Sequence, residues 1–250
     1  MNTETSLDKA LTVLETIARS GGARLTDLAH ASDYPAATTH RILSLLLRRG
    51  YVRQDPATKT YMLGLKCLDV FSRVQPNLKI ITHARPVMQQ LMESTGETVN
   101  LVLFENDEAV YIDQVANRKS LLRMFTRVGA RVPLQSSGVG KAYLATLPQA
   151  EVAAYFRRAA KVRYTRKTLT RQRDFLRDIE QARARGYAVD REEFEEGVGC
   201  IAGVVTHGDG VAGAISISGP SSRLFGRHAD RLAAEVVRSA AAISMRLGAS

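Results

Sequence analysis

The order of residue types between residues 25 and 64 constrains this chain more than any other stretch. Residues 25–31 carry apolar side chains at helical spacing, and Pro35 follows, so one helix should end and a second begin there. The second helix, expected over residues 36–49, starts small and polar and becomes apolar in its second half. Such a helix can enter a DNA major groove with its first turns and anchor in a core with its last.

A short β-hairpin is expected directly after this second helix. Two alternating runs, residues 51–53 and 59–64, flank a turn that contains Pro56, a pattern typical of a hairpin. A further helix over residues 6–20, which Ser6 can cap, supplies a third helix for a common core. Together these parts predict a winged helix-turn-helix, although a small helical domain that binds a partner protein would show the same leucine spacing.

The second helix and the hairpin hold the residues predicted to contact DNA. The helix start would meet base edges or adjacent phosphates, and the hairpin would meet phosphates or the minor groove. These residues are Ala37, Thr38, Thr39, His40 and Arg41 in the helix, and Arg53, Lys59 and Thr60 in the hairpin. One such helix covers only a few base pairs, so a two-fold pair on a pseudo-palindromic operator of double-stranded DNA is expected.

The net charge of +10 favours an anionic partner but does not locate the DNA-binding segment. The excess of basic residues is larger after residue 75 than before it. Residues 155–173 form a basic run without an acidic residue. A solvated surface explains this run more simply than an auxiliary contact with the DNA backbone, and both interpretations stay open.

Cysteine content and hydropathy indicate the compartment. Cys67 and Cys200 are too few for a disulfide framework, which favours a reducing cytoplasm. The N-terminus has no basic region followed by an apolar run, so no signal peptide is expected. No window reaches eighteen uninterrupted apolar residues, so the sequence predicts no membrane span.

The domain organisation follows from a change of period along the chain. We expect a DNA-binding domain at residues 1–64, a helical connector at 65–76 and a second domain at 77–250. Strands are expected over residues 98–105, 109–115, 121–127, 187–190, 201–206 and 211–218. Helices alternate with them, including 78–94, in which Pro86 implies a kink or restart, and a final helix over 225–247. The fold class predicted is α+β, with a mainly antiparallel sheet.

Motifs for catalysis, metals and nucleotides are absent from the sequence. Residues 138–142 hint at a phosphate loop, but Gln135 replaces its first glycine and Ala142 replaces its Ser/Thr. No CxxC, HExxH or GxSxG occurs, so we predict no cofactor, metal site or catalytic residue. Cys200 and His207 remain conceivable as nucleophile and base, but a single cysteine on an apolar strand is more often a small packed residue.

Short motifs along the whole chain resemble the IclR family of bacterial transcriptional regulators. They are SLDKAL at 6–11, ATTHRIL at 37–43, GYVRQ at 50–54, STGETVN at 94–100, IDQV at 112–115, LLRM at 121–124, SGVGKAYLA at 137–145 and AISISGP at 214–220. Each is weak alone, and together in this order they are specific. The resemblance implies a winged helix joined to a GAF-like effector domain, in homodimers or dimers of dimers.

The resemblance also implies a set of effector-binding residues. In a family member that responds to a small 2-oxo acid, the ligand is held by a loop at a helix start, an Asp, a Cys and two serines. The matching polar positions are Gly138, Val139, Asp190, Cys200, Ser216 and Ser218, and the matching apolar wall is Leu121, Met124, Val132 and Val198. Val139 replaces a smaller residue and Val198 a leucine, and the acidic run after Asp190 differs, so the pocket volume and the effector stay open.

The sequence therefore predicts a DNA-binding transcriptional regulator, expected to repress, whose operator binding is modulated by a small carboxylate or 2-oxo acid. One rival is an enzyme whose GAF-like domain uses Cys200, with the winged helix as an accessory. Another is a ligand-binding module that acts through protein contacts. The sequence leaves open the target operon, the choice between repression and activation, and the choice between dimer and tetramer.

Overall fold

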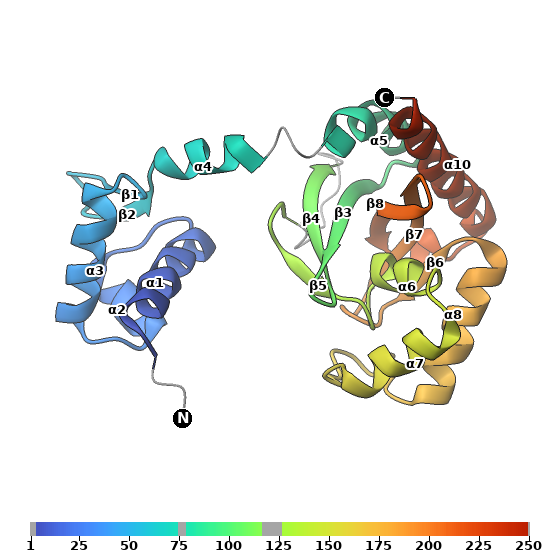
Figure 1. The fold of residues 1–250 in the computed structure, drawn as a ribbon, viewed down its shortest axis with the longest axis horizontal. Helices are drawn as coiled ribbons and strands as arrows, with labels where there is room; N and C mark the ends of the chain where they lie inside the picture. The colour runs from blue at the N-terminus through green and yellow to red at the C-terminus, as the bar shows by residue number, and fades with distance from the viewer. Residues whose placement is uncertain (1–3, 75–78, 117–126, 250) are drawn as a thin grey trace. The chain divides into compact units, whose positions relative to one another are not determined.

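The computed structural model describes residues 4–74, 79–116 and 127–249 (Figure 1). Two compact units divide the chain, Met1–Leu78 and Lys79–Ser250, and each is described by itself. Within the described residues, we find no helix with the length and apolar character needed to cross a lipid bilayer.

The first unit is a three-helix core with a hairpin. Its elements are α1 (Ser6–Ser20), α2 (Leu25–Ser32), α3 (Ala36–Arg48), β1 (Val52–Gln54), β2 (Tyr61–Leu63) and α4 (Lys66–Val74). The helices bury a common cluster that includes Val13, Leu28 and Leu43. Thr5, and not Ser6, caps α1: its hydroxyl accepts from the Asp8 amide while the Asp8 carboxylate accepts from the Thr5 amide.

Local hydrogen bonds fix the tip of the β1–β2 hairpin. The Asp55 carboxylate accepts from the amides of Ala57 and Thr58 at 2.9 and 2.8 Å, which closes the turn after Pro56. Lys59 adopts a left-handed conformation with φ of 59° and leads the chain back into β2. A backbone bridge from Ala23 to Tyr61 ties the hairpin to the helices. The basic hairpin tip is therefore held in a defined place on the unit.

The second unit is built on a six-stranded sheet with the order β5-β4-β3-β8-β7-β6, antiparallel at every described pair. The strands are β3 (Thr98–Glu105), β4 (Glu108–Val115), β5 (Arg131–Pro133), β6 (Ala188–Arg191), β7 (Val198–His207) and β8 (Gly210–Pro220). The helices are α5 (Lys79–Thr95), α6 (Gly138–Leu144), α7 (Gln149–Arg158), α8 (Gln172–Arg185), α9 (Ser221–Leu224) and α10 (Ala229–Gly248).

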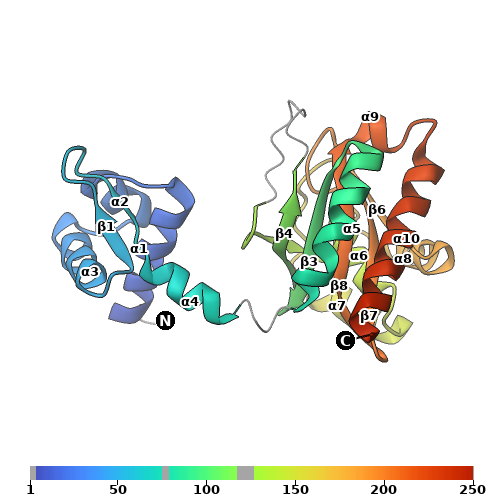
Figure 2. The same cartoon turned by 90° about the horizontal axis from the view of Figure 1, so that it is seen from above.

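Helices cover both faces of this sheet (Figure 2). Helices α5 and α10 pack side by side on one face, which buries Ile201, Ile215 and Ile217. Helices α6, α7 and α8 lie on the other face with a second cluster that includes Ala202 and Ala214. Because side chains alternate along a strand, Cys200 and Ser218 face α6, not α10.

Several element predictions need correction. The strand expected at 121–127 falls mostly on residues outside the described ones, and the short strand β5 was not expected. The final helix, expected over residues 225–247, is α10 and begins only at Ala229, and the short helix α9 before it was not expected. Helix α5 runs continuously through Pro86, so the helix does not restart there.

A buried ion cluster joins three segments of the second unit. The Lys141 side chain in α6 is fully buried, and its Nζ lies 2.7 Å from Asp178 Oδ2 in α8. The same Nζ lies 2.5 Å from Glu193 Oε1 in the turn after β6. Burial disfavours the ammonium, but the two carboxylates outweigh this effect and raise the pKa of Lys141. Lys141 therefore stays charged and cross-links the three segments.

Candidate functional site

The start of α3 presents a small polar surface to solvent. Ala37, His40 and Arg41 are exposed, and Thr38 is half-buried. Thr39 is fully buried, and its hydroxyl donates to the Pro35 carbonyl at 3.2 Å. The prediction that Thr39 contacts DNA is therefore wrong, because this side chain belongs to the helix packing.

The hairpin presents the remaining predicted DNA contacts. Arg53 and Lys59 are exposed, and Thr60 is half-buried. The Arg53 guanidinium contacts the Met62 sulfur across the hairpin at 3.7 Å. It forms no ion pair with a carboxylate of the described residues. A polar helix start and a cationic hairpin thus share one unit, which is the arrangement of a winged helix-turn-helix DNA-binding domain.

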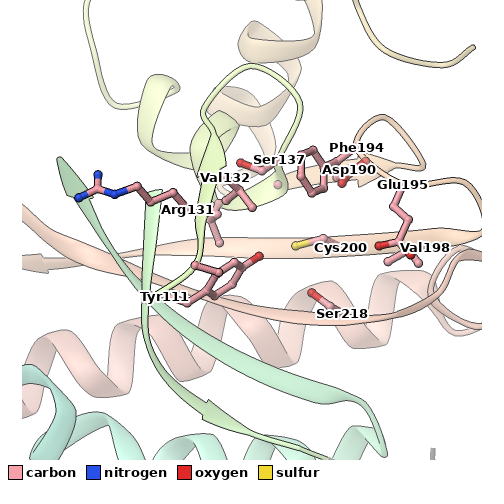
Figure 3. A pocket seen from close by; sticks show the side chains of 13 residues that line it. Tyr111, Arg131, Val132, Ser137, Asp190, Phe194, Glu195, Val198, Cys200 and Ser218 are labelled. Carbon is pink, nitrogen blue, oxygen red and sulfur yellow. The ribbon is translucent and has the colours of Figure 1, made fainter. Parts of the chain in front are cut away.

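The second unit contains a cavity of about 190 Å³ between its sheet and the start of α6 (Figure 3). The predicted effector residues that line it are Val132, Gly138, Val139, Asp190, Val198, Cys200 and Ser218. Leu121 and Met124 lie outside the described residues. Ser216 faces the same side of β8 as Ser218 and is buried opposite Ala202. Its hydroxyl lies within hydrogen-bond reach of the Cys200 thiol, but Ser216 is not among the residues that line the cavity.

The cavity has further walls that the sequence analysis missed. They are Tyr111, Ala130, Arg131, Ser137, Phe194 and Glu195. Strand alternation could have found Tyr111, because β4 buries every second side chain. Arg131 contributes little charge to the cavity, since its side chain turns away (Figure 3) and its guanidinium pairs with Glu105 and Glu108 at 2.5 and 3.3 Å.

Close packing brings the backbone of α6 to the cavity wall. A Cβ on Gly138 would lie 2.8 Å from Cys200 Sγ, so only glycine fits between α6 and β7. The Ser137 hydroxyl donates to the Pro133 carbonyl at 2.7 Å and accepts from the Gly140 amide at 3.1 Å. The amides of Gly138 and Val139 lie in the first turn, where a helix offers its N–H groups no internal acceptor.

A short polar chain leads to Ser218. The Gln114 side-chain amide donates to Asn100 Oδ1 at 2.9 Å, and Asn100 Nδ2 donates to Ser218 Oγ at 3.2 Å. Because Ser218 Oγ accepts from Asn100, its own proton is available to Cys200 or to a ligand in the cavity.

Asp190 is the titratable group that most affects the chemistry of the cavity. Burial raises its pKa to about 7, and the Glu193 carboxylate adds to the shift. The Glu193 backbone amide donates to Asp190 Oδ1 at 2.6 Å, and this hydrogen bond partly opposes the rise in the pKa of Asp190. Near neutral pH a large fraction of Asp190 is therefore the neutral acid, which donates a hydrogen bond and does not repel an anionic ligand.

The structure separates the two residues of the rival cysteine enzyme. His207 ends β7, seven residues beyond Cys200 on the same strand, so the two lie roughly 20 Å apart and point to opposite faces. Burial, with a contribution from Asp190, raises the pKa of the Cys200 thiol to about 11. Cys200 is thus a protonated thiol at neutral pH, with no histidine base from His207.

These features define a winged-helix regulator with a second, ligand-binding domain, and the comparisons identify its family. The IclR helix-turn-helix domain model matches residues 6–56, and the model for the C-terminal domain of the bacterial transcriptional regulator IclR matches residues 73–245. The chain therefore belongs to the IclR family: it is a DNA-binding transcriptional regulator with an effector-binding C-terminal domain, as its sequence motifs predict.

Relatives and solved structures agree with this assignment. The acetate operon repressor of Salmonella typhimurium is 35% identical over 97% of this chain and 90% of its own length. The transcriptional repressor AllR of Escherichia coli is 38% identical over 88% of this chain and 81% of its own length. Both of these relatives are transcriptional repressors.

Two solved structures share the fold over nearly the whole chain. The IclR protein of Thermotoga maritima has a TM-score of 0.81 at 31% identity, covering 97% of this chain and 98% of that one. An IclR homologue of Microbacterium hydrocarbonoxydans in complex with 4-hydroxybenzoate has a TM-score of 0.83 at 21% identity, covering 98% of this chain and 100% of that one.

The Asp190→Asn variant should change how stability depends on pH. Folded Asp190 keeps its proton up to a pKa of about 7, whereas the unfolded chain loses it near the ordinary value of 3.8. The wild-type free energy of unfolding, relative to that of the variant, should therefore fall as pH rises from about 4 to about 7, by roughly 2–4 kcal/mol. Urea unfolding at pH 5 and pH 8 measures this difference.

Asp209→Asn on the exposed β7–β8 turn is the control for the same change from carboxylate to amide outside the cavity. If the difference in the free energy of unfolding between wild type and Asp190→Asn does not change between pH 5 and pH 8, Asp190 is ionised throughout this range.

Proposed function

We propose that this regulator binds a small carboxylate, such as a 2-oxo acid, in the cavity at the start of α6. We further propose that this occupancy modulates binding of a repressor dimer or dimer of dimers to a pseudo-palindromic operator in the cytoplasm. The observation that carries the proposal is the convergence of neutral hydrogen-bond donors on one partly apolar cavity.

Three kinds of donor support an anionic ligand. The amides of Gly138 and Val139 start α6, Ser218 has a hydroxyl proton to give, and Asp190 is substantially neutral. A desolvated carboxylate is stabilised by several such hydrogen bonds, each stronger than a bond between neutral groups. A family match to a 2-oxo acid site supports the same residues.

The cavity size and its apolar wall support a compact ligand. Val132, Val139 and Val198 line the cavity, whose volume is about 190 Å³. This volume favours a ligand of a few carbons over a bulky aromatic acid, because a typical drug-sized pocket begins at about 300 Å³. The complex of the Microbacterium homologue makes 4-hydroxybenzoate the aromatic acid to test beside the small ones.

Operator binding should depend on α3 and on the hairpin in different ways. Arg41→Ala should weaken binding by about 1–3 kcal/mol and relax the base preference, if Arg41 reads a base with two hydrogen bonds. Lys59→Ala should weaken all sequences alike and reduce the salt dependence by about one counterion. Gel-shift titrations on the upstream DNA of the gene, at several salt concentrations, measure both effects.

The control for this series is Arg238→Ala, which removes an exposed guanidinium from α10 in the second unit. Equal DNA affinity of wild type, Arg41→Ala and Lys59→Ala would move the DNA interface elsewhere on the chain.

Exposed apolar residues beside and on α4 support the dimer. Leu65, Leu68 and Phe71 have exposed fractions of 77, 62 and 45%, so the described residues of the first unit leave this face largely uncovered. Wild-type protein at micromolar concentration should scatter light as a dimer or larger assembly. Leu68→Asp should shift it towards monomer, because a carboxylate would be buried in an apolar contact, whereas Lys66→Gln on the same helix should not. A monomeric wild type, with and without DNA, contradicts this proposal.

The two strand serines should differ in effector binding. Ser218→Ala removes a hydrogen bond to the carboxylate and should weaken pyruvate binding by about 1.5–3 kcal/mol, while operator binding without ligand stays at the wild-type level. Ser216→Ala is the matched control, because Ser216 lies on the same strand face but outside the cavity. Isothermal titration calorimetry measures both. Unchanged pyruvate affinity in Ser218→Ala would place the site elsewhere.

A further inference from the structure

Tyr111 places an unpaired hydroxyl in the effector cavity. Its side chain, in β4, is 8% exposed and lines the cavity. Figure 3 shows the hydroxyl pointing inward from the sheet, towards Cys200. In the described part of the chain this hydroxyl has no hydrogen-bond partner, whereas Ser218 on the same sheet already accepts from Asn100.

The Tyr111 hydroxyl lies at the cavity, where water or a ligand can accept its hydrogen bond. A ligand carbon that displaced the water would leave this donor unsatisfied, at a cost of about 1–3 kcal/mol, so a ligand oxygen placed there is favoured over a carbon. Burial, together with nearby Cys200 and Asp190, raises the pKa of Tyr111, so the phenol keeps its proton and acts as a donor. An oxygen atom of the ligand is the natural acceptor.

The position of Tyr111 indicates which ligand oxygen it meets. Figure 3 shows Ser137, the cap of α6, above the strand that carries Cys200, and Tyr111 beside the Cys200 sulfur at the level of the sheet. The amides of Gly138 and Val139 therefore lie on the α6 wall and Tyr111 on the sheet wall. A carboxylate bound at the α6 wall leaves its neighbouring carbon facing the sheet, so a substituent on that carbon can reach Tyr111.

We propose that Tyr111 is a specificity-determining residue whose hydroxyl donates to the oxygen on C2 of the effector. The site then selects 2-oxo and 2-hydroxy carboxylates over the alkyl carboxylate of the same length. This inference rests on the proposed function, because it assumes that a small carboxylate occupies the cavity.

Three acids that share a three-carbon chain test this inference on the full-length protein. Pyruvate and lactate carry an oxygen on C2, and propionate carries hydrogen. Calorimetry at pH 6.5 should show wild type binding pyruvate and lactate roughly tenfold more tightly than propionate. Tyr111→Phe should bring this ratio close to one, mainly by weakening the two oxygenated acids. Tyr111→Met, which keeps much of the bulk and has no donor, should lose the same selectivity.

Tyr143→Phe is the matched control. Tyr143 lies in α6 and stacks on Phe104, with ring centroids 4.3 Å apart, but does not line the cavity. The Tyr143→Phe variant should keep the wild-type ratio of the affinities for pyruvate and lactate to the affinity for propionate. Melting temperatures of the variants verify that each is folded.

The other outcomes separate two failures. If Tyr111→Phe weakens all three acids equally, or leaves the ratio unchanged, the inference about Tyr111 is wrong while the proposed effector class stands. If wild type binds none of the acids but still binds its operator, the small-acid effector is wrong, and the inference about Tyr111 falls with it.

Discussion

The buried charge of Lys141 is the interaction on which the effector cavity depends. One ammonium faces the carboxylates of Asp178 and Glu193, so α6, α8 and the turn after β6 cannot separate without leaving a desolvated charge unpaired. The Glu193 amide in turn donates to Asp190. An ion cluster whose residues do not line the cavity thus positions both the backbone amides of α6 and the Asp190 carboxyl group at the end of β6.

This regulator would recognise two anions by two physical routes. The winged helix offers exposed cations, Arg41 and Lys59, which under the proposed function would displace counterions from the DNA phosphates. The described cavity wall instead offers neutral donors, because Lys141 and Arg131 are already paired: Lys141 within the buried cluster and Arg131 with Glu105 and Glu108. Neutral donors discriminate by geometry more than by charge, which suits a sensor that must ignore most acids in the cell.

The sequence predicted the larger elements well because their patterns are local. The α2–α3 turn, the hairpin and the antiparallel sheet follow from proline, turn residues and alternation, and the family motifs located most of the cavity wall. Positions that depend on distant neighbours were harder to predict. Thr39 is on the polar start of α3 but is buried by the packing of the unit. Ser216 shares a face with Ser218 but is buried opposite Ala202 and is not among the residues that line the cavity. Tyr111 enters the site only because β4 lies in the same sheet as β7 and β8.

The contact between Gly138 and Cys200 limits how this sensor can evolve. With 2.8 Å between a Cβ at 138 and the sulfur at 200, the two positions share one fixed space, so neither can grow unless the other shrinks. Gly140 is held more tightly still, since its Cβ would lie 2.2 Å from the Leu134 backbone. Gly138 and Gly140 therefore fix the backbone at the start of α6, and a descendant acquiring a new effector would do so by exchanging the side chains at 111, 132 and 198 around it.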